Sequence, residues 1–439
     1  MKIVLFEDSR VSQLHPVTLG RAAFGITCAT FRILDIMMQI SSEIYALCRP
    51  YLEGISQYEY PQVRFGANVL KEDLKSVSPD TPILLVNARA VPNAKIVDFV
   101  RLLEKDAALK YVPWQDDPAM IYVSAGELLR RWGDAVEADF SEMFPFEQQE
   151  YFAESAPIEL FDFLHDIIRN NIEFFQSNLD YRLAHCVPSK TGRNENPWTE
   201  GRWEEIRDGV FVAPNVRLGD YLVTDTSKGA IFIDEGASIG PFCYIKGPVY
   251  IGPYSKVIEH AALKDYVGLA HTTKVGGEVE ASTIEPFTNK QHHGFLGHSY
   301  LGSWINLGAG TCNSDLKNTY GAISLDTREG RIATSMQFHG CVVGDYAKTA
   351  INTSIFTGKI IGSCSMVYGF VTRNVPCFTN YARSFGQCTE LPVEVMISTQ
   401  QRMFARRNVQ QERVHVELLQ KMFELSVSER QMETEPLSL

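Results

Sequence analysis

The chain contains no cysteine pair at metal-ligand spacing, no long apolar run and no excess of basic residues. Its nine cysteines are scattered without a Cys-x-x-Cys pair, which argues against a zinc ribbon or a disulfide framework and favours reduced, buried thiols. No stretch reaches the roughly eighteen apolar residues of a membrane-spanning helix. Acidic residues follow the first apolar run, MKIVLFEDSR, too soon for a signal peptide. These absences predict a cytoplasmic protein with no membrane partner.

The charge balance argues against a nucleic-acid partner as well. The 41 lysines and arginines stand against 53 aspartates and glutamates, a net charge of −12. A surface of that sign repels phosphate backbones and anionic lipids. At 439 residues the chain is long enough for two or three domains, each with its own core.

The strongest pattern in the chain is a repeat of six residues. Eight successive positions at this spacing are aliphatic: Ile233, Ile239, Ile245, Ile251, Val257, Leu263, Leu269 and Val275. The spacing returns at Ile305 and at Val343, Thr349, Ile355, Ile361 and Val367, and Val212 and Leu218 fit it after a slip of three residues. Neither the period of a strand nor that of a helix gives sixes. The repeat predicts a parallel β-helix with turns of about eighteen residues, because a row of buried sandwich strands would not hold one phase so long.

The front of the chain has the pattern of an α/β, Rossmann-like domain. Residues 2–6 (KIVLF) and 82–87 (PILLVN) predict buried strands, and helices are expected at 31–48, 94–109, 124–136 and 157–184. Asn87 and Arg89 follow the second of these strands, at the end where such sheets bind ligands. We expect a first domain at 1–187, a polar, proline-flanked linker at 188–208, the β-helix at 209–380, and a tail at 381–439 with an amphipathic helix over 401–425.

The richest chemistry lies where the six-residue spacing is interrupted, between Val275 and Ile305. His292, His293 and His298 lie within seven residues there. Histidine is the side chain best suited to accept a proton near neutral pH, and the glycines around it allow close approach of a ligand. The alternative is that glycine and asparagine serve tight corners and the histidines are solvated. A zinc site is less favoured, because no cysteine or carboxylate is suitably spaced nearby.

The motifs in this stretch resemble the acetyltransferase half of the bifunctional family that makes UDP-N-acetylglucosamine. HHGFLG at 292–297 and SWINLGAG at 303–310 are similar to the family's His-x-x-Tyr-x-Gly and Asn-x-Gly-Ala-Gly, and TCNSD at 311–315 to its Thr-Cys-Asn-Tyr-Asp. The resemblance implies that His292 is the catalytic base and that Phe295, Asn306 and Asn313 bind substrate. Proximity alone places Lys290 at the sugar phosphate. His298, and after it His293, are the alternative bases.

The front domain resembles a divergent branch in which an atypical sugar nucleotidyltransferase domain is fused to a left-handed β-helix. The similarity lies in EDSRVSQLHPVTLGRAAF, with Asp8, Pro16, Thr18 and Arg21 at the positions of its motif. The glycine-rich Gly-x-Gly-Thr-Arg-Met signature is absent, which leaves Arg10 and Arg21 to bind nucleotide phosphates unless they are ordinary surface arginines. Asn87 stands where the family has an aspartate that binds Mg²⁺, and an amide is a poorer ligand for this ion. The metal ligands stay unassigned.

The resemblance implies a transferase of nucleotide-sugar synthesis. It would transfer an acetyl group from acetyl-CoA to a sugar phosphate of the glucosamine-1-phosphate type, and join a sugar-1-phosphate to a nucleoside triphosphate with Mg²⁺. Family members are homotrimers, which implies a homotrimer here. Two alternatives stay open: a nucleotidyltransferase whose β-helix serves only trimerisation or regulation, and a non-catalytic scaffold. The sugar, the nucleotide and the length of the acyl chain are not determined.

Overall fold

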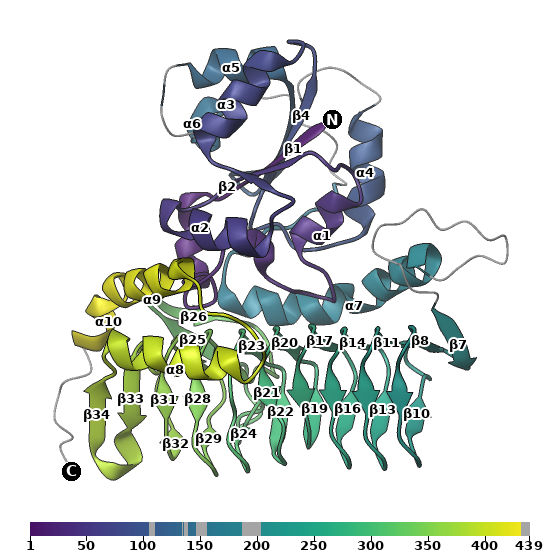
Figure 1. Ribbon diagram of the computed structural model, residues 1–439, viewed down its shortest axis with the longest axis vertical. Helices are drawn as coiled ribbons and strands as arrows, with labels where there is room; N and C mark the ends of the chain where they lie inside the picture. The colour runs from purple at the N-terminus through teal and green to yellow at the C-terminus, as the bar shows by residue number, and fades with distance from the viewer. Residues whose placement is uncertain (105–109, 134, 136–138, 146–155, 187–202, 432–439) are drawn as a thin grey trace. The chain divides into compact units, whose positions relative to one another are not determined.

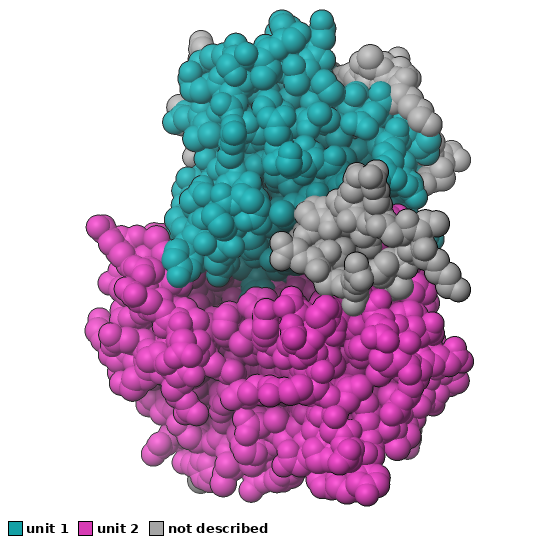
Figure 2. Space-filling view, turned by 45° about the vertical axis from the view of Figure 1, so that its right-hand side comes forward, with its two compact units in different colours: residues 1–14, 21–26, 31–163 teal, residues 15–20, 27–30, 164–439 magenta. Residues whose placement is uncertain are grey.

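The computed structural model describes residues 1–104, 110–133, 135, 139–145, 156–186 and 203–431. Internal contacts divide the chain into two units, coloured separately in Figure 2. Unit 1 contains Met1–Leu14, Arg21–Ile26 and Phe31–Phe163, and unit 2 contains His15–Gly20, Thr27–Thr30 and Leu164–Leu439. The expected boundary at residue 187 differs from this division, because helix α7 (Leu164–Cys186) belongs to unit 2. Residues 188–202 of the expected linker lie outside the described residues.

Unit 1 is built on a six-stranded sheet with the order β3-β2-β1-β4-β6-β5. The strands are β1 (Lys2–Phe6), β2 (Ile44–Leu47), β3 (Arg64–Phe65), β4 (Pro82–Asn87), β5 (Lys110–Trp114) and β6 (Asp117–Ser124). β1 pairs in parallel with β2 and β4, and β6 runs antiparallel to β4. The helices are α1 (Ile33–Met38), α2 (Pro50–Glu59), α3 (Ala67–Ser76), α4 (Lys95–Leu103), α5 (Ala125–Trp132) and α6 (Phe140–Met143). The predicted α/β class and both predicted strands are confirmed.

Two of the expected helices are wrong in extent. The helix expected over 31–48 ends at Met38, and Ile44–Leu47 is a strand instead, because it pairs residue by residue with β1 in the buried sheet. Such pairing outweighs local helix preference. The helix expected over 401–425 is two helices, α8 (Val393–Ala405) and α9 (Arg413–Leu425). Asn408 between them has a φ of 55°, a left-handed conformation that a continuous helix excludes.

Unit 2 is a parallel β-helix, as predicted (Figure 1). One face is the nine-stranded sheet of β7 (Glu204–Arg207), β8 (Val210–Val212), β11 (Ile231–Ile233), β14 (Val249–Ile251), β17 (Val267–Leu269), β20 (Thr283–Ile284), β23 (Tyr300–Leu301), β27 (Cys341–Val343) and β30 (Lys359–Ile361). The second face contains β9 (Arg217–Leu218), β12 (Ser238–Ile239), β15 (Lys256–Val257), β18 (Lys274–Val275), β21 (Asn289–Lys290), β28 (Lys348–Thr349), β31 (Met366–Val367), β33 (Thr379–Ala382) and β34 (Gln387–Glu390). The third contains β10 (Val223–Asp225), β13 (Tyr244–Lys246), β16 (Ala262–Lys264), β19 (Glu278–Glu280), β22 (Phe295–Gly297), β24 (Cys312–Asn313), β29 (Ser354–Ile355) and β32 (Phe370–Val371).

The six-residue repeat forms the core of this coil. All eight positions from Ile233 to Val275 are at least 97% buried and lie in one continuous apolar cluster. Residues one turn apart face each other across neighbouring strands, as Ile233, Ile251 and Leu269 do. Burial of each such side chain contributes roughly 1.5 to 3 kcal/mol to folding.

The coil continues through the stretch where the spacing is interrupted. Val275 pairs with Lys290 and Leu269 with Ile284, so this turn is shorter than its neighbours while the strands stay stacked. Further on, Leu301 pairs with Val343, and the residues between β24 and β27 leave the coil. They carry the antiparallel hairpin of β25 (Ser324–Thr327) and β26 (Gly330–Ala333).

Helices cover parts of the coil. α7 runs along the nine-stranded face (Figure 1), where Phe175 packs edge-on against Tyr266 and Arg182 lies over the ring of Tyr250. Near the other end, Phe404 of α8 lies 4.3 Å from Trp304, measured between ring centroids. The last helix is α10 (Val427–Gln431). None of the described helices has the length and apolar character needed to cross a membrane.

Candidate functional site

The corner between β21 and β22 carries the histidine motif. The side chains of His292 and His293 are exposed, and Phe295 on β22 is partly exposed. Within the described residues neither of these two imidazoles has a hydrogen-bond partner. His292 is therefore accessible to a substrate, but nothing in the single chain fixes the orientation of its ring.

Lys290 lies inside the coil. It occupies the inward position that pairs with Val275, and 2% of its surface is exposed. Its ammonium donates to the carbonyls of Gly276 (2.7 Å) and His292 (2.8 Å). Burial lowers its pKa to about 8, because the charged form loses its hydration. Lys290 holds the backbone of the histidine corner, and we therefore leave it out of the phosphate site proposed below.

The three remaining residues of the predicted acetyltransferase site lie on two faces of the coil. Asn306 is exposed beside Asn289, whose amide donates to it at 3.4 Å, on the face that contains β21 and β28. Phe295 and Asn313 belong to the face that contains β22 and β24. Asn313 is buried, and its amide accepts from and donates to the backbone of Gly297 at 2.9 and 3.0 Å. One chain thus does not gather these three side chains on a single surface.

An oriented histidine, His298, directly follows the motif at the end of β22. His298 Nδ1 lies 2.8 Å from Asp315 Oδ2, and the ring stacks on Phe338 at 5.2 Å. Both partners of the ion pair are 14% exposed. Its other nitrogen, Nε2, has no hydrogen-bond partner among the residues that the structure describes. A carboxylate on Nδ1 fixes the tautomer and leaves Nε2 as a proton acceptor. His298 has the geometry of a general base.

A pocket of about 590 Å³ lies beside Asp315, and its lining includes Cys312, Asn313, Ser314, Leu316, Lys317, Phe356 and Thr357. Its volume is within the range of small-molecule sites. One cation, Lys317, lines the pocket, and its ammonium donates to the carbonyl of Ala322 at 2.6 Å. The pKa of Lys359 is lowered mainly by burial and further by Arg331 and Lys317. Lys359 lies on β30, opposite Cys341 of β27, and is not part of the pocket lining.

The carboxyl edge of the sheet in unit 1 contains a buried ionic cluster. Arg89 is fully buried, and its guanidinium donates to Asp8 (2.7 and 2.8 Å), Asp117 (2.6 Å) and Asp162 (3.2 Å). Burial by itself lowers the pKa of Arg89, but the bonds to Asp8 and Asp117 outweigh this and raise it. Arg10, 30% exposed, adds ion pairs to Asp117 (2.8 Å) and Asp162 (3.4 Å). Three carboxylates therefore meet two guanidinium groups.

The predicted nucleotide-binding residues differ in their exposure and in their hydrogen-bond partners. Asn87 is fully buried, and its amide donates to Asp8 at 2.7 Å and to the carbonyl of Pro118 at 3.2 Å. Arg10 is the most exposed cation of the cluster. Arg21 is partly exposed, and its carbonyl accepts from Arg49. Arg89, which follows Asn87 by two residues, bonds to all three carboxylates at this edge of the sheet.

The cluster does not fit Mg²⁺ as it is arranged. Mg²⁺ needs carboxylate oxygens that are open to the ion and to water, whereas Asp8, Asp117 and Asp162 are already bonded to Arg89. Asp162 also accepts from Trp114 and Gln115, each at 3.1 Å. Among the described residues, the group of side chains that could hold a metal lies in unit 2.

Parts of the chain are similar to known proteins. Residues 3–181 match the sequence model of a family described as sugar nucleotidyl transferase. A bifunctional sugar-1-phosphate nucleotidylyltransferase/acetyltransferase of Sulfurisphaera tokodaii is 32% identical over 152 residues, which are 34% of this chain and 38% of that protein. The bifunctional protein GlmU of Bartonella quintana is 27% identical over 178 residues, 39% of this chain and 33% of that protein. The matches thus span between a third and two-fifths of these relatives.

Among solved structures, the chain is similar to a UDP-N-acetylglucosamine acyltransferase of Francisella novicida, with 14% identity and a TM-score of 0.34. This match covers 53% of the chain and 79% of that protein. A putative acetyltransferase of Bacillus cereus is covered to 99%, with 15% identity and a TM-score of 0.23. Scores of this size carry no argument about the reaction.

Proposed function

We propose that the chain is a bifunctional transferase of nucleotide-sugar synthesis, because residues 3–181 match the sugar nucleotidyl transferase family and a parallel β-helix follows them. The β-helix transfers an acetyl group from acetyl-CoA to an amino-sugar phosphate, and unit 1 transfers a nucleotidyl group to a sugar-1-phosphate. UDP-N-acetylglucosamine is the product that the resemblance of the sequence motifs implies. The observation that carries the acetyl-transfer half is the pair of His298 and Asp315, since Ser314 and Leu316 on either side of Asp315 line the pocket.

In the proposed acetyl transfer, His298 Nε2 accepts a proton from the amino group of the sugar. The freed amine attacks the thioester carbon of acetyl-CoA; the new amide bond forms as the carbon–sulfur bond breaks, and coenzyme A leaves as a thiol after taking up a proton. Asp315 stabilises the imidazolium that forms and keeps its ring oriented. Lys317 supplies positive charge for the sugar phosphate.

Two histidines compete for the role of base. The family resemblance favours His292, and the geometry of the single chain favours His298, because only His298 has a carboxylate partner. In a homotrimer, which we also propose, a neighbouring chain could orient His292. Phe295, Asn306 and Asn313 keep their predicted substrate-binding roles within this proposal, with each site shared between chains.

For unit 1 we propose that Arg10 and Arg21 bind the phosphates at the carboxyl edge of the sheet, with Asn87 and Arg89 holding the edge in shape. Any Mg²⁺ would arrive with the nucleotide, since the carboxylates of the cluster are occupied. The protein would act in the cytoplasm, where nucleoside triphosphates and acetyl-CoA are available.

The test is an assay of coenzyme A release from acetyl-CoA with glucosamine-1-phosphate, in parallel with pyrophosphate release. We expect His298→Ala to lower kcat for acetyl transfer by about 10² to 10⁴-fold, the usual loss for a general base, and Asp315→Asn to lower it less. His260→Ala, an exposed histidine of the coil outside the motif, is the matched control. Pyrophosphate release should not change in any of these variants. A large loss in His292→Ala with a normal His298→Ala would assign the base to His292.

The second candidate function is a nucleotidyltransferase whose β-helix only trimerises or senses a metabolite. The division of the acetyltransferase motif between two faces of the coil is the observation that favours it. Pyrophosphate release with no coenzyme A release on any amino-sugar phosphate would support this reading.

A further inference from the structure

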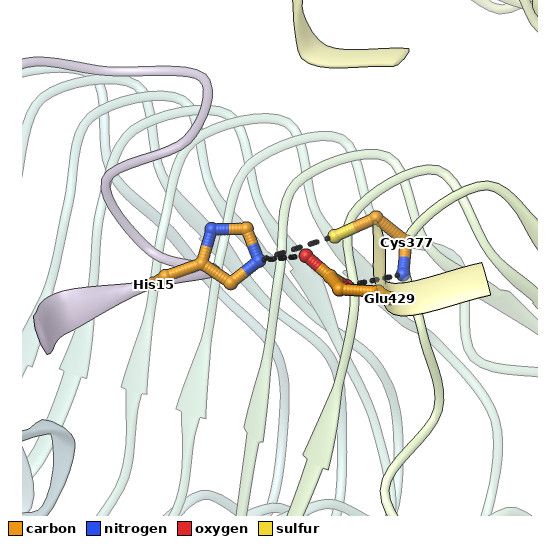
Figure 3. Close-up of side chains that lie close together, drawn as sticks. All are labelled: His15, Cys377 and Glu429. Carbon is orange, nitrogen blue, oxygen red and sulfur yellow. Dashed lines mark hydrogen bonds and ion pairs between the residues drawn. The ribbon is translucent and has the colours of Figure 1, made fainter. Parts of the chain in front are cut away.

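Three side chains from distant parts of the sequence meet within unit 2 (Figure 3). His15 follows the 3-10 helix Ser9–Leu14, Cys377 precedes β33, and Glu429 lies on α10. His15 Nε2 is 2.7 Å from Glu429 Oε1 and 3.5 Å from Cys377 Sγ, and the three donor atoms lie within 4.8 Å of one another. Cys377 is fully buried, and the side chains of His15 and Glu429 are 12% and 14% exposed.

The arrangement is not that of a cysteine nucleophile. In a nucleophile–histidine–carboxylate relay the nucleophile and the carboxylate contact opposite ring nitrogens. Here the thiol and Glu429 both contact Nε2. The second oxygen of Glu429 accepts from the backbone N–H of Cys377 at 3.0 Å, which aims the first oxygen at the same point.

A positive charge already occupies the point where the donors converge. Arg328, between β25 and β26, donates from Nη2 to His15 Nε2 at 2.9 Å and forms an ion pair with Glu429 Oε1. A guanidinium only donates, so in this contact His15 offers the lone pair of Nε2. A nitrogen lone pair, a carboxylate oxygen and a sulfur thus face one cationic position.

We propose that His15, Cys377 and Glu429 form a binding site for a divalent transition metal ion of the zinc class. Sulfur and imidazole favour Zn²⁺ or Co²⁺ over Mg²⁺ and Ca²⁺. Donors 2.0 to 2.3 Å from a tetrahedral zinc ion lie roughly 3.3 to 3.7 Å apart. The distance from His15 to Cys377 fits this range, and Glu429 moves back by roughly half an ångström to admit the ion. Three protein ligands leave the fourth position to water.

In the protein without a metal ion, the guanidinium of Arg328 occupies the position proposed for the ion. Its side chain is 44% exposed at a hairpin tip, so it can turn to solvent when the ion binds. The ion binds the thiolate, and the thiol proton of Cys377 is released to water. The bound metal ties residues 15–20, the last turns of the coil and α10 together. None of these residues belongs to the pair of His298 and Asp315, so the site is separate from the proposed acetyl-transfer site.

The experiment uses the full chain without a polyhistidine tag, stripped with a chelator and titrated with Co²⁺. We expect one ion per chain, a thiolate-to-cobalt charge-transfer band in the near ultraviolet, release of one proton, and loss of the band when Zn²⁺ is added. Cys377→Ser, which is nearly isosteric, should abolish the band. Cys388→Ser, a partly buried cysteine on β34, is the matched control and should keep it.

Arg328→Gln distinguishes a metal site from an ion-pair cluster. Removing the competing positive charge should tighten Co²⁺ binding by about tenfold or more, and Glu429→Gln should weaken it. Circular dichroism establishes that each variant is folded. The proposal is overturned if the natural chain shows no charge-transfer band, if Cys377→Ser keeps the band, or if Arg328→Gln binds more weakly than the natural chain.

Discussion

Arg89→Met tests whether the buried ionic cluster holds unit 1 together. Methionine is apolar and removes all of the bonds that Arg89 makes to Asp8, Asp117 and Asp162. Arg10, which is 30% exposed, would remain as a cation paired with Asp117 and Asp162, whereas Asp8 would lose the guanidinium of Arg89. Removing one partner of a buried ion pair costs about 3 to 5 kcal/mol, because the opposite charge stays buried without compensation. Domains are typically stable by about 5 to 15 kcal/mol, so the variant should be close to unfolding.

The assay is urea denaturation followed by tryptophan fluorescence. With a denaturant slope of about 2 kcal/mol per molar, the midpoint of unit 1 should fall by about 2 M. Arg101→Met is the matched control, because Arg101 is 60% exposed and its ion pair to Asp98 contributes under about 1 kcal/mol. Adding Asp8→Asn to Arg89→Met should restore part of the loss. Equal, small shifts for both methionine variants would refute the reasoning.

Three further predictions concern unit 2. The pKa of Lys290 is about 8 in the folded chain against 10.5 in the unfolded chain. Between these pH values the unfolded chain binds an extra proton, so the free energy of unfolding rises with pH. Lys290→Met should reduce that rise by up to about 3 kcal/mol, measured in denaturation curves at pH 8 and 10.5. Burial lowers the pKa of His339 to about 4, so stability should fall as pH drops from 6.5 to 4, and His339→Gln should flatten this fall by roughly 3 kcal/mol. Gly294 has a φ of 132°, and an added Cβ would lie 2.1 Å from the Thr311 carbonyl; Gly294→Ala should therefore cost at least about 2 kcal/mol in thermal unfolding, and Gly330→Ala, with φ 122° and open space, clearly less.

The sequence predicts the coil well because its signal is local and repeated. Each aliphatic residue from Ile233 to Val275 fills the same inward position, so a single rule applies to many turns. The rule fails at Lys290 and Asn313, where polar side chains take inward positions and bond to backbone atoms of the coil. Hydrophobic spacing cannot identify such positions, because their partners are backbone groups of another turn.

The sites are harder to predict because their residues come together only in the fold. Arg89 with its carboxylates, and the group of His15, Cys377 and Glu429, join segments that are far apart in sequence. His298 and Asp315 are only 17 residues apart, but they meet because neighbouring turns of the coil stack. The roles of His292 as catalytic base and of Asn306 as a substrate-binding residue rest on the family resemblance alone. Asn87 was expected to face a ligand, but strand β6 and Asp8 enclose it. That enclosure depends on the order of strands in the sheet, which residue patterns do not specify.

The most direct measurement of the proposed function incubates the purified full chain with glucosamine-1-phosphate, acetyl-CoA and each nucleoside triphosphate in turn, with mass spectrometry of the sugar products. A bifunctional transferase yields the N-acetylated sugar phosphate and, with one of the nucleotides, the corresponding nucleotide sugar with release of pyrophosphate. Unchanged glucosamine-1-phosphate in every reaction, from a folded and trimeric protein, would contradict the proposal for both units.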